Sequence, residues 1–332
     1  MMKIRSGRRI RPPKLVPGDL VAFVAPSRPV APESLATATH ILESWGLSAT
    51  TRWLVPGGRG YLAGPDDDAR ALAIENALCD PHVKAVWCAR GGHGAGRLLT
   101  KIDWARVRAT GQAKWFIGYS DVTALHLGIA HELNWVTLHG PVAALLDVDG
   151  PSVTTAGLRG ALTSSRAPGR LPVPGVAEGW DPLTAVIREG SASGPLTGGN
   201  LALVASLVGT TWAMVGAEHV VMLEDVSEAP YRIDRMLLQL RQSGALDGCR
   251  AVVFGSSPTC ERAPDDRPSL DLLEVIDGLL GDLGVPVIYG WPIGHTSHQW
   301  TLPLGCGVTV EASGRGMATS WLSVDEAGTE VR

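Results

Sequence analysis

The stretch WFIGYSDVTALHLG, residues 115–128, joins two different patterns of apolar residues. A run of large apolar residues is typical of a buried strand, and the apolar spacing that follows is typical of a helix. We therefore expect a strand at KWFIGYS (114–120) and a helix at DVTALHLGIAHEL (121–133). The single serine of the stretch, Ser120, stands at the junction between them.

Strand and helix patterns alternate in the same way through residues 17–147. Further strands are expected at DLVAFVAPS (19–27), VKAVWCARGG (83–92) and WVTLHGPV (135–142), with helical spacing between them. This alternation predicts an α/β fold, a parallel sheet with helices on both faces. Functional groups of such sheets gather at the carboxyl ends of the strands. The residues at those ends are Pro26, Ser27, Arg90, Gly91, Gly92 and Ser120.

Changes in composition divide the chain into four expected regions. A basic tail, residues 1–16, has no apolar stretch behind it; it is expected to be solvated and is not typical of a secretory signal. The N-terminal domain follows at residues 17–147. A segment rich in Gly, Pro, Ser and Thr, residues 148–183, is interpreted as a linker. Residues 184–332 are expected to form a smaller mixed α/β or barrel-like domain.

Composition also limits the class of partner. The net charge is −4 at pH 7 and no long basic run follows the tail, which argues against nucleic acid as a partner. No apolar run reaches the ~18 residues needed to cross a bilayer, so a soluble chain without a membrane partner is expected. The five cysteines contain no C-x-x-C pair, which argues against a disulfide framework and a zinc site and favours a cytoplasmic location.

Ser120 has two interpretations. The order strand, G-Y-S-D, helix matches a nucleophile elbow, in which a sharp turn exposes the hydroxyl and the helix start offers free N–H groups. The N–H of Asp121 would then donate to an oxyanion. The match to G-x-S-x-G is partial, because Val122 stands where the second glycine would be. The simpler alternative is that Ser120 caps the helix.

The segment ARGGHGAGRLL, residues 89–99, is the second candidate. Its glycines let backbone N–H groups approach an anion or an oxyanion. It lacks the G-K-[ST] of a Walker loop and is not a clean G-x-G-x-x-G, so a dinucleotide site is poorly supported. Gly91 and Gly92 would fit the second half of an oxyanion hole beside Ser120, and a tight turn without a ligand is the alternative.

An acid at a strand end is the third candidate. In VVMLEDVSEAPYRIDRML, residues 220–237, Glu224 ends an apolar run and precedes Asp225. A carboxylate at a buried strand end is unfavourable unless it is paired. It would be either the partner of a catalytic imidazole or a member of an acidic cluster neutralised by Arg232 or Arg235.

A loop histidine is the fourth candidate. His295 lies in GWPIGHTSHQWTLPLG, residues 290–305, a Gly- and Pro-rich segment of the kind that carries function on a scaffold. His298 is a competitor, and a solvated histidine is the alternative. The order Ser120, Glu224, His295 along the chain is that of the α/β-hydrolase triad, which predicts that these three residues act together.

These segments resemble the LD-carboxypeptidases, a family of serine peptidases that also contains the microcin-immunity peptidases. The resemblance covers nearly the whole chain in the family's order and implies a flavodoxin-like N-terminal domain and a barrel-like C-terminal domain. It also implies a homodimer that needs no metal or organic cofactor. The matching stretches are GDLVAFVAPS, AVWCARGGHGAGRLL, FIGYSDVTALHLGI, LHGPV, GPLTGGNLALVASLVGT, LEDVSEAPYRIDRMLLQL and PIGHTSHQWTLPLG.

The resemblance implies a role for each matching position. The nucleophile of the family's G-[FY]-S-D motif falls on Ser120, the triad glutamate on Glu224 and the triad histidine on His295. The implied reaction is hydrolysis of an L,D-peptide bond of the murein tetrapeptide through an acyl-enzyme. The oxyanion donors fall on Gly91, Gly92 and the N–H of Asp121.

The sequence also offers candidates for contacts with substrate. Arg90 and Arg232 are candidates for binding a substrate carboxylate, because a guanidinium suits bidentate recognition. Trp180 would stack on an aromatic substrate group, or it belongs to the core or the surface. His93 replaces a frequent tyrosine of the family's glycine turn, which affects substrate contacts. A peptidyl or aminoacyl nucleotide is the alternative substrate, and a non-catalytic nucleotide-binding module is the alternative of another class.

Overall fold

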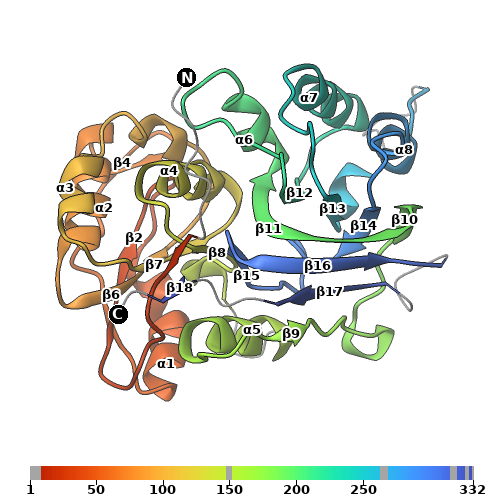
Figure 1. The fold of residues 1–332 in the computed structure, drawn as a ribbon. Helices are drawn as coiled ribbons and strands as arrows, with labels where there is room; N and C mark the ends of the chain where they lie inside the picture. Colours follow the sequence, from red (N-terminus) through yellow and green to blue (C-terminus); the bar gives the residue numbers. More distant parts are fainter. Residues whose placement is uncertain (1–8, 147–151, 262–267, 315–319, 326–328, 331–332) are drawn as a thin grey trace. The chain divides into compact units, whose positions relative to one another are not determined.

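The computed structural model of the protein describes residues 9–146, 152–261, 268–314, 320–325 and 329–330. The chain forms two compact units. The N-terminal unit contains Met1–Arg166, Thr301–Gly305 and Ala327–Arg332, and the C-terminal unit contains Ala167–Trp300 and Cys306–Glu326. Each unit is built around its own sheet (Figure 1). The predicted domain limits stay a prediction, and part of the expected linker, residues 148–151, lies outside the described residues.

The sheet of the N-terminal unit has the strand order β15-β8-β7-β6-β2-β3. Its first five strands along the chain pair in parallel, and β15 joins the edge antiparallel to β8. The strands are β2 (Leu20–Val24), β3 (Ser48–Thr50), β6 (Val83–Cys88), β7 (Trp115–Gly118), β8 (Thr137–His139) and β15 (Leu302–Leu304). Shorter pairs join β1 (Ile10–Arg11) to β18 (Thr329–Glu330) and β4 (Gly58–Arg59) to β5 (Leu62–Ala63).

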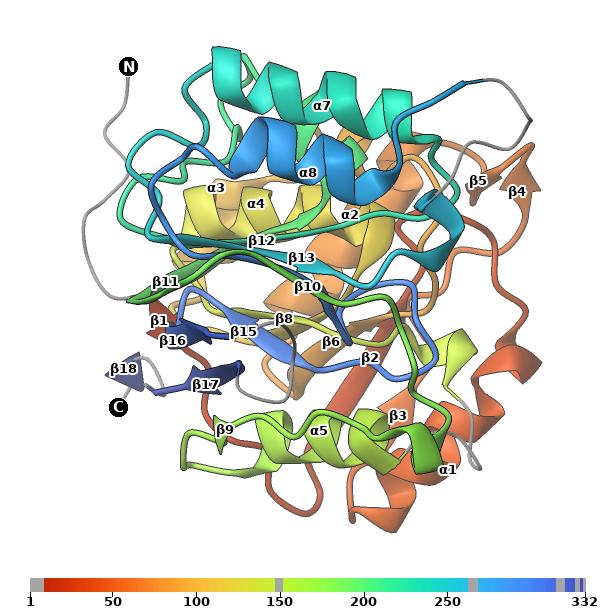
Figure 2. The same ribbon diagram turned by 90° about the vertical axis from the view of Figure 1, so that its right-hand side faces the viewer.

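Helices cover both faces of this sheet. In Figure 2, α2, α3 and α4 lie on one face and α1 lies on the other. The central strands β6 and β7 are almost entirely buried, as expected for parallel strands covered on two sides. The helices are η1 (Pro32–Leu35), α1 (Ala36–Ser44), α2 (Asp67–Cys79), η2 (Ala95–Leu98), α3 (Trp104–Ala109), η3 (Ser120–Val122), α4 (Thr123–Leu133), η4 (Ala143–Leu145) and α5 (Ser152–Thr163).

The C-terminal unit contains an eight-stranded sheet with the order β10-β14-β13-β12-β11-β16-β17-β9. The central strands β11 to β14 pair in parallel and the outer pairs are antiparallel. The strands are β9 (Gly169–Arg170), β10 (Ala185–Arg188), β11 (Gly190–Asn200), β12 (Val220–Glu224), β13 (Ala251–Gly255), β14 (Val287–Trp291), β16 (Gly307–Ala312) and β17 (Trp321–Val324).

The longer helices of this unit pack side by side on one face of its sheet (Figure 2). In α7, the buried residues Ile233, Leu237 and Leu240 recur at the three- and four-residue spacing of one helix face. In α8, Asp271 and Glu274 form a reciprocal capping box that fixes the helix start. The helical segments are η5 (Val176–Glu178), α6 (Leu201–Ser206), α7 (Pro230–Gln242), η6 (Pro258–Cys260) and α8 (Leu272–Leu280).

The expected mixed α/β fold with parallel sheets is confirmed, but the expected solvated tail is wrong for the buried residues Arg11, Pro12 and Leu15. Arg11 is buried, donates to the carbonyl of Ser164 and lies over the ring of Trp115. Leu15 is also buried, and the Trp115 indole donates to the carbonyl of Pro13. The apolar stems and the ring offset the loss of solvent around this basic segment. Residues 1–8 lie outside the described part of the chain.

Candidate active site

Ser120 stands at a strained turn between β7 and α4. Its φ of 64° lies in the left-handed region, which costs a non-glycine residue ~1–2 kcal/mol. The N-cap of η3 is Tyr119 and that of α4 is Val122, and neither makes a side-chain cap hydrogen bond. Ser120 is therefore not the helix cap. A strained strand-to-helix turn is the conformation that a nucleophile elbow requires.

The glycine turn after β6 packs directly against Ser120. A Cβ atom placed on Gly91 would lie 3.0 Å from Cβ and 3.2 Å from Oγ of Ser120. On Gly92, whose φ is +132°, a Cβ atom would lie 2.4 Å from Cγ of Arg28. The prediction that this turn lies beside Ser120 is therefore confirmed, and any side chain at Gly91 would crowd the serine hydroxyl.

The carboxylate of Asp121 connects three loops at the carboxyl edge of this sheet. Its Oδ2 accepts hydrogen bonds from Oγ of Ser27 at 2.6 Å and from the backbone N–H of Ala95 at 2.8 Å. Asp121 is buried, so both bonds form away from water. The sequence predicts a role only for the backbone N–H of Asp121, and this role of its side chain is an addition from the structure. The serine at the end of β2 was the available signal, because its hydroxyl follows a buried strand.

The guanidinium of Arg70 binds the same two loops through their carbonyl groups. It is fully buried beneath the turn and donates to the carbonyls of Pro26 and, at 3.4 Å, Gly94. It also pairs with Asp67 on its own helix. Arg70 thus binds the carbonyls that immediately precede the two groups held by Asp121. The two side chains together fix the loop after β2 and the glycine turn around the serine elbow.

The buried Glu224 and the partly exposed His295 form a pair in the C-terminal unit. Nδ1 of His295 lies 2.7 Å from Oε2 of Glu224, and the glutamate side chain is fully buried at the end of β12. Burial lowers the pKa of His295 most, but the hydrogen bond and charge of Glu224, with the charge of Asp225, outweigh it and raise this pKa above its ordinary value. The carboxylate is thus in the position that orients a catalytic imidazole.

Gly294 makes the close approach of these two side chains sterically possible. Its φ is +85°, and a Cβ atom there would lie 2.2 Å from Oε2 of Glu224. The side chain of Gln299 donates to the carbonyl of Gly294 at 3.0 Å, and Trp300 N–H donates to the carbonyl of Pro292. These two hydrogen bonds connect the two ends of the loop that carries His295. Sequence analysis noted the density of glycine here but did not predict its cause.

Asp225 is held by its own set of donors next to Glu224. Its carboxylate accepts hydrogen bonds from Nδ2 of Asn200 at 3.1 Å and from the N–H groups of Ala202 and Val226 at 2.9 and 2.8 Å. Burial, and then the charge of Glu224, raise the pKa of Asp225 to about 6 despite these bonds. Asp225 therefore contributes to the electrostatics of the histidine rather than to its orientation.

Three residues were predicted to contact substrate, and the structure places each of them differently. Arg232 is exposed and pairs with Glu228 at 3.3 Å, so the alternative that it neutralises Glu224 or Asp225 is wrong. Arg90 is exposed at the start of the glycine turn. Trp180 is only 6% exposed, which favours the alternative of a core position.

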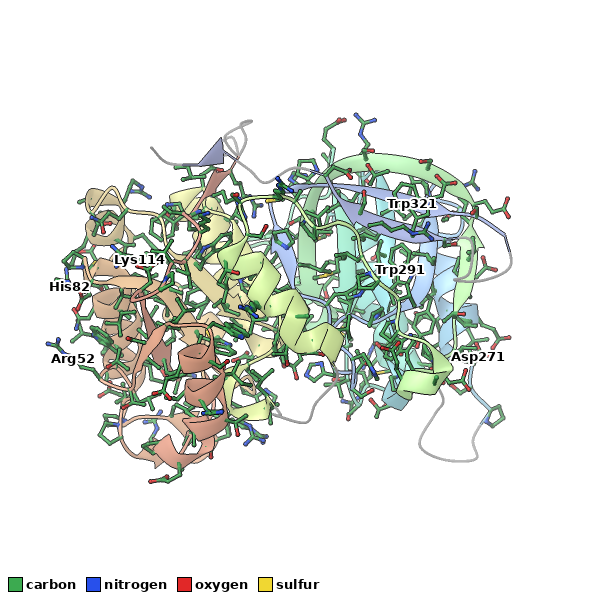
Figure 3. All side chains as sticks on the ribbon, turned by 90° about the horizontal axis from the view of Figure 1, so that it is seen from below. Arg52, His82, Lys114, Asp271, Trp291 and Trp321 are labelled. Carbon is green, nitrogen blue, oxygen red and sulfur yellow. The ribbon has the colours of Figure 1, made fainter. Side chains whose placement is uncertain are left out.

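Two other histidines near these segments, His298 and His126, are buried. His298 is buried and packs edge-on against Trp180. His126 is buried with Nε2 at 2.9 Å from the carbonyl of Gly118, and burial lowers its pKa to about 3, so it stays neutral. Trp291, labelled in Figure 3, is fully buried at the end of β14.

No cluster of three or more His, Cys, Asp or Glu side chains suited to a metal ion occurs in the described ranges of the chain. Nor does any helix of these ranges have the length and apolarity to cross a membrane. The chemistry that the described side chains offer is a serine hydroxyl at a strained turn, a glycine turn beside it, and a carboxylate-bound imidazole. Groups of these kinds are the ones that serine hydrolases use.

Comparison with known proteins shows to which family this chain belongs. Residues 21–140 match the LD-carboxypeptidase N-terminal domain and residues 193–310 match the LD-carboxypeptidase C-terminal domain. The chain is 35% identical over 298 residues to a probable murein peptide carboxypeptidase of Bacillus subtilis, covering 89% of each chain. It is 30% identical to the murein tetrapeptide carboxypeptidase of Pseudomonas aeruginosa, covering 88% of this chain and 93% of that relative. The chain belongs to the LD-carboxypeptidase family.

Solved structures agree with this assignment. The muramoyltetrapeptide carboxypeptidase of Oxalobacter formigenes superposes with a TM-score of 0.75 and 28% identity, covering 92% of this chain and 99% of that chain. MccF in complex with glutamyl sulfamoyl guanosine superposes with a TM-score of 0.81 and 20% identity, covering 96% and 99%. The second likeness concerns the fold alone.

Proposed function

We propose that the protein is a serine carboxypeptidase that removes the terminal D-alanine of the murein tetrapeptide by cleaving its L,D-peptide bond. The family assignment supports this reaction class, and the two relatives named for murein peptides support the substrate. The observation that carries the proposal is Ser120, held at φ 64° beside Gly91. Backbone strain of this kind clusters at active sites, and its position between a strand and a helix beside the glycine turn supports a nucleophile here.

The proposed reaction begins with proton transfer from Ser120 to His295. Glu224 orients the imidazole and stabilises the imidazolium as it forms. Oγ of Ser120 attacks the carbonyl carbon before the D-alanine, and the oxyanion accepts N–H bonds from the glycine turn at Gly91 and Gly92 and from Asp121. Each such donor typically contributes ~3 kcal/mol to lowering the barrier.

Collapse of the tetrahedral intermediate breaks the peptide bond, and His295 gives its proton to the leaving D-alanine nitrogen. Water then attacks the acyl-enzyme, with His295 accepting the water proton and returning it to Ser120. The proposed mechanism requires His295 and Ser120 to come within hydrogen-bond reach during the reaction. No step of it uses a metal or organic cofactor.

The finer structural expectations belong to the same proposal. The parallel order β3-β2-β6-β7-β8 supports a flavodoxin-like N-terminal domain, because it is the 2-1-3-4-5 order of that group. We infer in addition a barrel-like C-terminal domain, a homodimer, and a cytoplasmic role in recycling wall peptides. Sedimentation of the purified chain tests the dimer.

The test is hydrolysis of the murein tetrapeptide, followed as release of D-alanine, by the wild type and by Ser120→Ala, Glu224→Gln and His295→Ala. We expect release by the wild type and loss of about a thousandfold or more in each alanine variant. A fluorophosphonate probe should label the wild type and not Ser120→Ala. Unchanged release by Ser120→Ala would contradict the triad.

A second substrate is favoured by the likeness to MccF bound to an aminoacyl nucleotide analogue. The same triad would then hydrolyse a peptidyl or aminoacyl nucleotide. Assays with both substrates distinguish the two, because the preferred one gives the higher kcat/KM. A nucleotide-binding module without catalysis would hydrolyse neither and would resist the fluorophosphonate probe.

A further inference from the structure

Arg28 lies just after the end of β2 and packs against the glycine turn. A Cβ atom on Gly92 would lie 2.4 Å from Cγ, 2.9 Å from Cδ and 3.1 Å from Nε of Arg28, so the arginine stem fills the space beside this glycine. A Cβ atom on Gly91 would likewise lie 3.2 Å from Oγ of Ser120. Two successive glycines therefore contact the proposed nucleophile and an arginine.

This spacing suits recognition of the end of a peptide. When the last residue is removed, only its nitrogen and Cα separate the scissile carbonyl carbon from the carboxyl carbon, a span of about 4 Å or less. The Cα atoms of successive residues are also about 3.8 Å apart. A scissile carbonyl held at Ser120 and Gly91 would therefore place the terminal carboxylate about one residue away, where Arg28 lies against Gly92.

The charge of Arg28 is available to a ligand. Its side chain is exposed and, within the part of the chain that the structure describes, makes no hydrogen bond or ion pair. Two other arginines considered above are already engaged, since Arg70 binds Asp67 and Arg232 binds Glu228. The packed stem of Arg28 also limits the rotamer entropy that ligand binding would remove.

We propose that Arg28 binds the free terminal carboxylate of the substrate and so restricts cleavage to the last residue of a peptide; this rests on the proposed function. A planar guanidinium forms two parallel N–H···O bonds with a carboxylate, which adds direction to the charge attraction. Arg28 takes this role in place of Arg232, whose guanidinium is bound to Glu228.

The experiment compares two matched substrates, the murein tetrapeptide with its free terminal carboxylate and the same peptide with a terminal amide. Arg28→Ala should raise KM for the free acid by about 10- to 100-fold, the range of a lost charge-assisted pair, and leave kcat/KM for the amide within about twofold. Arg28→Lys should recover part of the loss, because lysine keeps the charge without the planar fork. Arg52→Ala is the matched control, since Arg52, labelled in Figure 3, is also an exposed arginine of this unit. Its guanidinium lies over the ring of Trp53.

Two outcomes would overturn the assignment of Arg28. One is an unchanged KM for the free acid in Arg28→Ala, and the other is an equal loss on acid and amide, which would indicate a role in supporting the turn. Binding to the Ser120→Ala background, measured by calorimetry, separates this proposal from the proposed function. If the wild type does not hydrolyse either peptide but Arg28→Ala still weakens binding of the free acid alone, the catalytic proposal fails and carboxylate recognition stands.

Discussion

The Nδ1 atom of His295 lies 2.7 Å from Oε2 of Glu224, whose side chain is fully buried. A carboxylate at this distance accepts a hydrogen bond from Nδ1–H and leaves Nε2 as the basic nitrogen of a neutral imidazole. It also favours the imidazolium, because it raises the pKa of His295 against the effect of burial. The pair thus determines both which nitrogen can take a proton and at which pH.

Glu224→Gln should lower activity and move its pH dependence. Since the pKa of His295 is raised in the wild type, the acid limb of kcat/KM against pH should lie above the ordinary histidine value of about 6.5. In the variant, the charge of Glu224 no longer opposes the effect of burial, so the limb should move to lower pH. The rate at the plateau should fall by about a hundred- to ten-thousand-fold.

Glu228→Gln is the matched control for this experiment, because Glu228 follows the same strand but pairs with the exposed Arg232. It should leave both the rate and the position of the limb unchanged. If the acid limb of kcat/KM in Glu224→Gln lay at the wild-type pH, a group other than His295 would be responsible for it.

Gly294→Ala should separate the pair. The new Cβ would lie 2.2 Å from Oε2 of Glu224 at a φ of +85°, so the glutamate must move away from His295. We expect a large fall in kcat and an acid limb shifted to lower pH, as in Glu224→Gln. Gly284→Ala controls for backbone strain, because its φ is +77° and nothing lies within 4 Å of a Cβ there. It should lower stability by ~1 kcal/mol and leave the pH profile unchanged.

The strand ends were predictable because their signals are local. The apolar run before Ser120 predicts where β7 ends, and Gly91 and Gly92 predict where β6 ends. Neither signal depends on distant residues. The carboxylate of Asp121 was not predictable in this way, since its partner Ser27 is 94 positions away and their hydrogen bond leaves no periodic pattern. The need for glycine at position 294 likewise depends on a distant glutamate that reaches the loop only after folding.

Ser120→Gly should stabilise the protein while it abolishes activity. Glycine adopts a φ of 64° without the Cβ penalty, so the free energy of unfolding should rise by ~1 kcal/mol. Ser120→Ala keeps the penalty and should lose activity without this gain. Ser227→Gly is a matched control, because Ser227 is an exposed serine at φ 57°; it should gain stability with full activity. Chemical denaturation of the three variants measures the difference, and no gain in Ser120→Gly would refute stored strain at the elbow.

Ser27→Ala should loosen the glycine turn relative to Ser120. The variant loses the 2.6 Å hydrogen bond to the buried carboxylate of Asp121, which is expected to cost ~1–3 kcal/mol of stability. Because the carboxylate also holds the N–H of Ala95, we expect a fall in kcat of about tenfold with little change in KM. Ser44→Ala, which removes an ordinary serine-to-helix-carbonyl bond, should leave kcat unchanged. Equal effects of the two variants on kcat would contradict this positioning role.

Asp225 should make the protein less stable as the pH rises. Its pKa is about 6 in the folded chain against 3.8 ordinarily, so the folded state holds the proton more tightly. The stability from this group is then fully present below about pH 4 and is lost as the pH rises through about 6, by up to ~3 kcal/mol. Asp225→Asn cannot ionise and should lack this slope, so the difference in unfolding free energy between variant and wild type should shift in favour of the variant between pH 4 and 7. Urea unfolding of both proteins across this range measures it, and parallel curves would mean that Asp225 titrates at its ordinary pH.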